Sequence, residues 1–299
     1  MKNIISFLLI FISLNIQAVA QTLSDLVETG NEPALVKTGF AFTEGPAVTR
    51  DGEIYFTDQP NNKIYIWNET DEIRLFDVDG ERANGLYFDA EGHLIACADY
   101  RNRLLRIPPD GEKTILADQF DHKLLNGPND LWIHPNGMIY ITDSYYHRPW
   151  WPEGRQQEQD CRAVYCVKPN GEMIRVIDDF IMPNGIIGTP DGKTLYVADI
   201  NDGKTWKYRI EPDGSLTGKT LFAPEGSDGM TIDNQSHVYL TNKAVSIFSS
   251  DGKKVGEIEI PERPANLCFG GKDRKTLFIT ARTSVYKIRM NVEGVENRK

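Results

Sequence analysis

The sequence has little of what builds disulfide-linked or zinc-binding proteins. Its 299 residues include only four cysteines and five histidines, and no Cys/His spacing is typical of a zinc site. Cys161 and Cys166 on one strand would lie roughly 16 Å apart, too far for a disulfide. Cys97 and Cys268 stand in apolar runs and are expected to be small core residues. The sequence therefore permits disulfides in an exported chain but does not require them.

Long apolar runs are absent after the first residues. Residues 4–15 (IISFLLIFISLN) follow the positive Lys2, and Ala18-Val19-Ala20 has the small-residue pattern that signal peptidase prefers. We therefore predict a signal peptide at residues 1–20 and a mature chain, residues 21–299, that is periplasmic or secreted. A membrane anchor is the alternative, but the run is shorter than the ~20 residues that a span needs. We expect no stable membrane association once the signal is removed.

Positive charge is also in short supply. Lys and Arg total 33 against 43 Asp and Glu, which gives a formal net charge of −10. An acidic chain repels nucleic acid and anionic lipid, so neither is an expected partner. The mature chain also lacks helical periodicity, apart from a turn near residues 22–28. The oligomeric state is not indicated by the sequence.

What the sequence does contain is one short motif, or phrase, that is repeated six times. An oxygen-bearing residue stands just before or at the start of an apolar run in "TEGPAV", "RANGLYF", "GPNDLWI", "MPNGII", "GSDGMTI" and "PANLCF". These six residues, here called the key residues, are Glu44, Asn84, Asn129, Asn184, Asp228 and Asn266. Eight positions after four of them come glycines in turn dipeptides such as Asp51-Gly52, which favour hairpins.

Two or three further β-rich runs follow each turn, at a repeat of about 40–45 residues. Three or four short antiparallel strands at this period are typical of a β-propeller blade. We predict an all-β, six-bladed propeller over residues 21–299. The run ALVKTGFAF at 34–42 is expected to supply the outer strand that the last blade lacks, which removes a free sheet edge. An open β-sandwich is the alternative, but it does not explain the constant eight-residue offset.

The first strand of each blade lines the axis of a propeller, so the six key residues should converge at one mouth of the channel. Two carboxylates and four amides in a confined place suit a hard divalent cation. Without an ion, Glu44 and Asp228 would repel each other. The alternative is that Asn-Gly and Asp-Gly serve only as turns, which leaves Glu44 unexplained. Asp58, Asp99, Asp143, Asp199 and Asn242, which end the second strands, are candidates for supporting hydrogen bonds or for simple turn residues.

The segment 144–160 (SYYHRPWWPEGRQQEQD) is unusually long for a link between two strands of one blade. It should rise from the same face as the key residues. Its Tyr145, Tyr146, His147, Arg148, Trp150 and Trp151 are candidates for a wall or lid over the site. A loop that contacts a partner protein or a neighbouring blade is the alternative.

Several phrases in fixed order resemble the gluconolactonase/regucalcin (senescence marker protein) family of six-bladed propellers. They are "FTEGPAV", "RANGLYFDAEGHLIACAD", "GPNDLWIHPNGMIYITD", "PNGIIGTPDGKTLYVAD" and "SDGMTIDNQSHVYLTN", and the resemblance covers about residues 35–290. It implies a single divalent metal ion, commonly Ca²⁺, with Zn²⁺, Mg²⁺, Mn²⁺ and Fe²⁺ as other oxygen-binding ions, and hydrolysis of a sugar lactone as the small-molecule substrate. The regucalcin-type members carry an Arg where this chain has Gly127.

The resemblance also implies roles for individual residues. Glu44, Asn184 and Asp228 match the family's metal ligands, and Asn129 matches a position that binds metal in some members and substrate or water in others. Asp228 matches the proposed catalytic carboxylate. Substrate recognition is expected from Asn129 together with His147, Arg148, Trp150 and Trp151. The alternative function is a non-catalytic, exported carbohydrate-binding or scaffold propeller with a structural metal ion.

Overall fold

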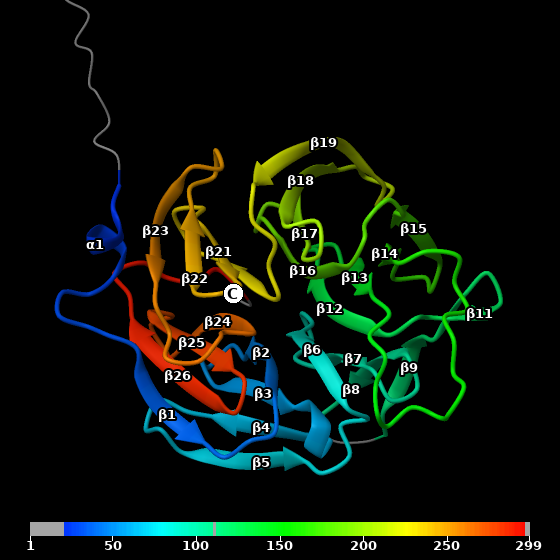
Figure 1. Cartoon of the computed structure of the whole chain (residues 1–299), viewed down its shortest axis with the longest axis horizontal. Coiled ribbons are helices and arrows are strands. Elements are labelled where there is room, and N and C mark those ends of the chain that lie inside the picture. The colour runs from blue at the N-terminus through cyan, green and yellow to red at the C-terminus, as the bar shows by residue number, and fades with distance from the viewer. Residues whose placement is uncertain (1–20, 110–111, 297–299) are drawn as a thin grey trace, which may run out of the picture.

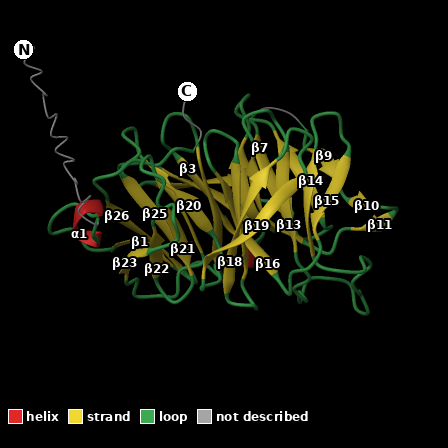
Figure 2. Cartoon of the chain, turned by 90° about the horizontal axis from the view of Figure 1, so that it is seen from above, coloured by secondary structure: helices red, strands yellow, loops and turns green. Residues whose placement is uncertain are grey.

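The computed structural model describes residues 21–109 and 112–296, and the predicted signal peptide lies outside them. Six four-stranded antiparallel sheets stand around a central axis as the blades of a propeller (Figure 1). Figure 2 shows the same sheets from the side, with little helix anywhere in the described chain. The predicted fold class is therefore confirmed.

The strands run outward from the axis in chain order within blades one to five. Blade one contains β2 (Thr43–Val48), β3 (Ile54–Asp58), β4 (Lys63–Trp67) and β5 (Ile73–Asp77). Blade two contains β6 (Ala83–Phe88), β7 (Leu94–Ala98), β8 (Arg103–Ile107) and β9 (Thr114–Ala117). Blade three contains β12 (Pro128–Ile133), β13 (Ile139–Asp143), β14 (Ala163–Val167) and β15 (Met173–Ile177).

The second half of the chain repeats the pattern. Blade four contains β16 (Pro183–Gly188), β17 (Thr194–Asp199), β18 (Lys204–Ile210) and β19 (Leu216–Ala223). Blade five contains β20 (Met230–Ile232), β21 (Val238–Thr241), β22 (Val245–Phe248) and β23 (Lys254–Ile258). The remaining small elements are the helix α1 (Leu23–Leu26), the 3-10 turn η1 (Gln59–Asn61) and the short hairpin of β10 (Gln119–Phe120) and β11 (Lys123–Leu124).

Blade six joins the two ends of the chain. Its inner strands are β24 (Asn266–Gly270), β25 (Thr276–Ala281) and β26 (Ser284–Arg289), and its outer strand is β1 (Ala34–Thr38). β1 pairs antiparallel with β26, with Leu35 opposite Tyr286. The N-terminal run thus closes the ring as predicted and covers an edge that would otherwise be open to aggregation.

The hairpin that joins the first and second strands of every blade needs one residue with a left-handed backbone. At the predicted eight-residue offset, φ is 92° at Gly52, 87° at Gly92, 89° at Gly137 and 70° at Gly192. The two copies without glycine keep the conformation, with φ of 66° at Ser236 and 59° at Arg274. The offset therefore reflects one backbone requirement repeated around the ring, which glycine meets at the least cost.

The core lies between neighbouring blades, and nearly every residue of inner strands such as β2, β7, β13 and β25 is buried. Trp132 of blade three, for example, packs where a Cβ on Gly188 of blade four would lie 2.3 Å from its ring. All four cysteines are free thiols. None of the helices within the described residues has the length and apolar character that a bilayer crossing requires.

Candidate active site

Five of the six key residues line one cavity at the axis. Glu44, Asn84, Asn129, Asn184 and Asp228 surround a space of about 320 Å³. The sixth, Asn266, is buried and donates from Nδ2 to Asp130 Oδ2 at 3.4 Å. Side chains separated by up to 184 residues in the sequence thus meet because each lies at the second position of an innermost strand or, for Asp228, just before one.

A local irregularity in the sheet aims these side chains at the axis. In blades one to four the pairing between the first two strands shifts register at the key residue, as between Glu44 and Ala47 or between Pro183 and Ile186. Such bulges bend a strand and redirect a side chain without ending the sheet. In blade five the strand begins only at Met230, so Asp228 lies just outside it.

The glycines that follow four key residues serve close packing of the innermost strands. A Cβ on Gly45 would lie 1.9 Å from the carbonyl oxygen of Asn84, and one on Gly85 would lie 2.6 Å from Asp130 Oδ1. A Cβ on Gly229 would lie 2.0 Å from the side chain of Asn266. Three of these four glycines lie inside innermost strands and Gly229 lies just before one, so a glycine after the key residue allows the ring to close tightly.

Carboxylates at the ends of three second strands fix the backbone in front of the key residues. Each accepts the N–H groups two and three positions before Glu44, Asn129 or Asn184. The bonds run from Ala41 and Phe42 to Asp58 (both 3.1 Å), from Asn126 (2.9 Å) and Gly127 (2.8 Å) to Asp143, and from Ile181 (2.7 Å) and Met182 (2.9 Å) to Asp199. The side chain of Asn242 donates to the carbonyl oxygen of Gly226 at 3.1 Å in the corresponding place of blade five. These residues hold the start of each innermost strand in place.

The two acidic residues of the cavity, Glu44 and Asp228, lie close enough for their charges to interact. Burial first, and then the negative charge of Asp228, raises the pKa of Glu44 well above its ordinary value. Burial likewise raises the pKa of Asp228 to about 6, although its side chain is only partly covered because it faces the cavity. Within the described chain, neither carboxylate has an ion-pair partner within 4.0 Å. The cavity therefore holds two acids whose ionisation costs free energy until a cation enters.

Asn184 connects the two sides of the cavity. Its amide nitrogen donates to Asp228 Oδ1 at 2.8 Å and to the Tyr146 hydroxyl at 2.9 Å. Both amide hydrogens are used, so the amide oxygen of Asn184 is left to accept or to ligate. Asp228 likewise keeps its second oxygen, Oδ2, without a protein donor among the described residues. The side chains of Asn84 and Asn129 have no hydrogen bond to any described residue, although both are about 95% buried.

This set of donors fits a hard divalent cation. The key residues offer oxygen atoms of two carboxylates and three amides to one space, and the residues lining it include no sulfur or imidazole. Ca²⁺ takes carboxylate, amide and water oxygens together in flexible geometry, and Mg²⁺ takes fewer protein ligands. Glu44, Asn129, Asn184 and Asp228 would hold such an ion.

A second acidic group lies elsewhere. Ligand atoms of Asp89, Glu91 and His93 lie within 4.8 Å of one another in the turn between β6 and β7, on the opposite face. The carboxylate of Asp89 already accepts from the backbone N–H groups of Glu91 and His93, and it lies 3.4 Å from Arg106. These contacts explain why Asp89, Glu91 and His93 lie close together: they form a hydrogen-bonded, charged turn.

The long segment between β13 and β14, residues 144–162, covers one side of the cavity. Tyr146 and Arg148 line the cavity, and Arg148 lies 5.1 Å from the Tyr146 ring centroid. Arg148 Nε donates to Asp99 Oδ2 at 2.6 Å, and the indole N–H of Trp151 donates to the Asp99 carbonyl oxygen at 2.8 Å. Burial raises the pKa of Asp99 to about 6 even though Arg148 opposes it. Asp99 therefore fastens this segment to blade two.

The other predicted recognition residues lie outside the cavity lining. His147 is exposed, Trp151 is buried against blade two, and Trp150 stacks between Arg82 and Arg148 at 4.6 and 5.5 Å from its ring centroid. Their predicted role in substrate binding remains a prediction. Trp150 packs against Arg148, and Trp151 bonds to the same Asp99 that accepts from Arg148.

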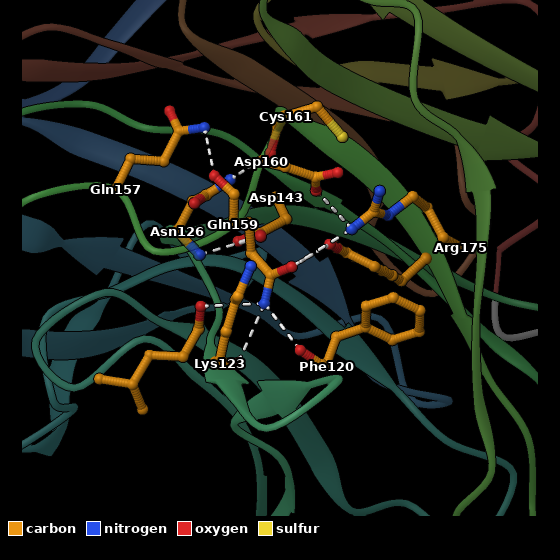
Figure 3. Close-up of polar contacts among 11 residues, drawn as sticks. Phe120, Lys123, Asn126, Asp143, Gln157, Gln159, Asp160, Cys161 and Arg175 are labelled. Atoms are coloured by element: carbon orange, nitrogen blue, oxygen red, sulfur yellow. Dashed lines mark hydrogen bonds and ion pairs between the residues drawn. The ribbon is translucent and has the colours of Figure 1, made fainter.

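The far end of the same segment is tied to the connection before blade three (Figure 3). The amide of Gln159 donates to the carbonyl oxygens of Phe120, Lys123 and Leu124, at 2.9, 3.0 and 3.2 Å. The side chain of Asn126 donates to the Cys161 carbonyl oxygen at 2.9 Å. The segment is thus anchored at both ends.

Three charged residues near the site were not among the predicted site residues. Arg263 and Arg282 line the cavity from blade six, and Asp130 is buried beside Asn129, where burial raises its pKa to about 7. Arg282 had a usable signal, because it occupies the turn after a second strand, and every such turn lies on this face. Arg263 lies outside the repeated phrases, and Asp130 lies within one of them but directly after the key position, so the repeat marks neither residue.

Comparisons with known proteins agree with this geometry. Residues 42–283 match the family model described as SMP-30/Gluconolactonase/LRE-like region. The gluconolactonase of Zymomonas mobilis is 25% identical over 303 residues, covering 91% of this chain and 85% of that protein. The diisopropyl-fluorophosphatase of Loligo vulgaris is 27% identical over 212 residues, covering 66% and 67%. A solved gluconolactonase structure from Xanthomonas campestris superposes with a TM-score of 0.82 at 25% identity, covering 90% and 92%.

Proposed function

Because the chain belongs to the SMP-30/gluconolactonase/LRE-like family, we propose that it is a lactonase that hydrolyses a sugar lactone with the aid of one divalent cation, expected to be Ca²⁺. The gluconolactonases among its relatives support the reaction class. The observation that carries the metal dependence is the set of oxygen atoms that Glu44, Asn129, Asn184 and Asp228 direct to one cavity from four different blades.

In this reaction water adds to the acyl carbon, the bond from the acyl carbon to the ring oxygen breaks, and the ring oxygen takes a proton to give a hydroxy acid. The chemistry that a bound divalent cation supplies is Lewis-acid polarisation of the ester carbonyl, worth several kcal/mol of the barrier. The protein must then orient the ester, position the water and accept its proton.

Asp228 is the residue proposed to accept the proton. Burial raises its pKa to about 6, so the carboxylate is a stronger base than an exposed aspartate, while a cation nearby opposes this effect. Asn184 Nδ2 holds Oδ1 at 2.8 Å, which leaves Oδ2 for the water. The free amide of Asn129 is placed to orient the water or the lactone. Tyr146 and Arg148 line the same cavity and are placed to contact the lactone.

The test is hydrolysis of D-glucono-1,5-lactone by the mature chain, followed as acid release. We expect turnover that EDTA abolishes and Ca²⁺ restores. Asp228→Asn should lower kcat by about 10²–10⁴-fold, the usual contribution of a general base. Asp202→Asn is the matched control, because Asp202 is an exposed carboxylate that pairs with Lys204 outside the cavity.

Turnover that persists in EDTA, or that is equal in the Asp228→Asn and Asp202→Asn variants, would contradict the proposal. Binding of Ca²⁺ and sugar acids without hydrolysis of any lactone would instead favour the non-catalytic carbohydrate-binding propeller.

A further inference from the structure

Two arginines of blade six line the cavity without a carboxylate partner. Arg263 precedes β24, Arg282 lies in the turn between β25 and β26, and both side chains are exposed. Among the described residues, Arg263 Nε donates only to the Asn242 carbonyl oxygen, at 3.2 Å. In the part of the chain that the structure describes, neither arginine forms an ion pair within 4.0 Å.

The nearest acidic residue in the sequence is already engaged. Glu262 Oε2 accepts from the backbone N–H and the hydroxyl of Thr283, both at 3.1 Å. Glu262 Oε1 accepts from the hydroxyls of Ser284 and Tyr286. With four donors satisfied, Glu262 fixes the turn that carries Arg282 and does not neutralise the arginines beside it.

The backbone of Arg282 is unfavourable for an arginine. Its φ is 46°, in the first position of a two-residue hairpin turn between Ala281 and Ser284. Glycine is preferred there, and a side chain costs on the order of 1–3 kcal/mol. The Arg282 carbonyl oxygen accepts the N–H of Thr43 at 2.7 Å, so the turn is held directly beside Glu44. Strain at a residue next to a site is a reason to look for a role of its side chain.

The charges around the cavity are unevenly matched. The lining residues include the carboxylates Glu44 and Asp228 and the cations Arg148, Arg263 and Arg282. Arg148 is neutralised by Asp99. If a divalent cation satisfies the two carboxylates, the arginines of blade six are left with positive charge and no protein anion. This occurs in a chain whose net charge is −10.

We propose that the lactone carries a second, anionic group, a carboxylate or a phosphate, which Arg263 and Arg282 bind while the ester lies against Asp228. The inference rests on the proposed function and narrows its substrate class. Guanidinium groups recognise both anions through paired, charge-assisted hydrogen bonds. Both arginines belong to blade six, so they would bind the anionic end of the substrate while the ester end lies against Asp228 in blade five.

The test compares two lactones that differ at one carbon. D-glucaro-1,4-lactone carries a carboxylate where D-glucono-1,4-lactone carries a hydroxymethyl group. We expect kcat/KM in the presence of Ca²⁺ to be at least about tenfold higher for the anionic lactone, mainly through KM, as one charge-assisted contact is enough for a factor of ten. Added salt should reduce this preference.

Variants assign the preference to the arginines. Arg263→Gln and Arg282→Gln should each lower the ratio of the two kcat/KM values, and the double variant should bring it near one. Arg101→Gln is the matched control and should keep the ratio, because Arg101 is exposed in the equivalent turn of blade two but does not line the cavity. Circular dichroism spectra and unfolding curves identify any variant that fails to fold.

A binding arm separates this inference from the proposed function. Calorimetric titration with D-glucarate, D-gluconate and 6-phospho-D-gluconate, each against a Ca²⁺ blank, should show that the two ligands with a second anionic group bind more tightly than D-gluconate, and that Arg263→Gln and Arg282→Gln abolish this difference. The tighter of glucarate and the phosphate ester identifies the anion. If the protein shows this binding pattern but no turnover, the proposed lactonase activity is contradicted and the anion site is supported. Metal-dependent turnover with equal kcat/KM for both lactones, or binding that is unchanged in Arg263→Gln and Arg282→Gln, would contradict the anion site and leave the lactonase proposal standing.

Discussion

Replacing Asp228 with Asn should stabilise the protein when no metal is present and deprive it of stabilisation by Ca²⁺. Asp228 faces Glu44 with no ion-pair partner within 4.0 Å among the described residues, and burial raises its pKa from 3.8 to about 6, although the charges of Arg263 and Arg148 oppose this rise. Such a rise corresponds to roughly 3 kcal/mol of preference for the protonated form. Because the side chain is partly open to the cavity, we expect about 1–3 kcal/mol.

The sign follows from proton binding. The folded-state pKa of Asp228 lies above that of the unfolded chain, so between pH 4 and pH 6 the folded protein binds more protons. The free energy of unfolding therefore falls as pH rises through this window, and the full penalty is present above about pH 6. Asparagine carries no charge and avoids the penalty. The gain from Asp228→Asn should thus be full at pH 8 and absent near pH 4.

Urea unfolding of both proteins in EDTA, at pH 8 and pH 4, measures this difference. Adding Ca²⁺ at 100 times its dissociation constant should stabilise the parent by about 2.7 kcal/mol and the variant hardly at all. The difference in free energy of unfolding between the two proteins should therefore shrink or change sign. Asp202→Asn should change stability by less than about 0.5 kcal/mol at either pH. A variant that is no more stable than the parent at pH 8 in EDTA, or equally stabilised at both pH values, would refute the reasoning.

Three further substitutions test how the site is built. Asp143→Asn should cost about 1–3 kcal/mol in urea unfolding, because two buried backbone N–H groups lose their carboxylate acceptor, and should weaken Ca²⁺ binding in calorimetry. Gly45→Ala should cost about 3 kcal/mol or more, since its methyl group would lie 1.9 Å from the Asn84 carbonyl oxygen, whereas Gly92→Ala, with open space around it, should cost only about 1 kcal/mol. Asp99→Asn should speed hydrogen exchange of residues 144–162; unchanged exchange would show that Asp99 does not hold this segment.

The number of blades, their strands and the closing strand could be predicted because one local requirement recurs six times. The positive φ at Gly52 and its equivalents fixes each hairpin, and the apolar runs on either side pair with each other. The β10–β11 hairpin carries no such signal, since contacts from Gln159 far along the chain hold its carbonyl groups. An element that is held by a single contact from a distant residue has no sequence motif that recurs in the other blades, so the repeat does not predict it.

The convergence of the key residues could also be predicted, because topology alone brings the starts of innermost strands to the axis. The orientation of the 144–162 segment could not. Its aromatic residues suggest a wall over the site, yet only Tyr146 and Arg148 line the cavity, and Trp151 turns toward Asp99. A long connection without periodicity gives no indication of which side chains face inward.

The mixture of amides and carboxylates in the ring has an electrostatic explanation. When both are ionised, Glu44 and Asp228 carry two negative charges, which the proposed divalent cation would balance, and amides complete the oxygen set without adding charge. A third carboxyl, Asp130, lies beside the ring, but burial raises its pKa to about 7, so it carries less than a full charge at neutral pH. Asn184 shows why amides suit this place: its nitrogen fixes Asp228 while its oxygen stays free. A carboxylate at position 184 could not donate to Asp228, and the two would repel each other.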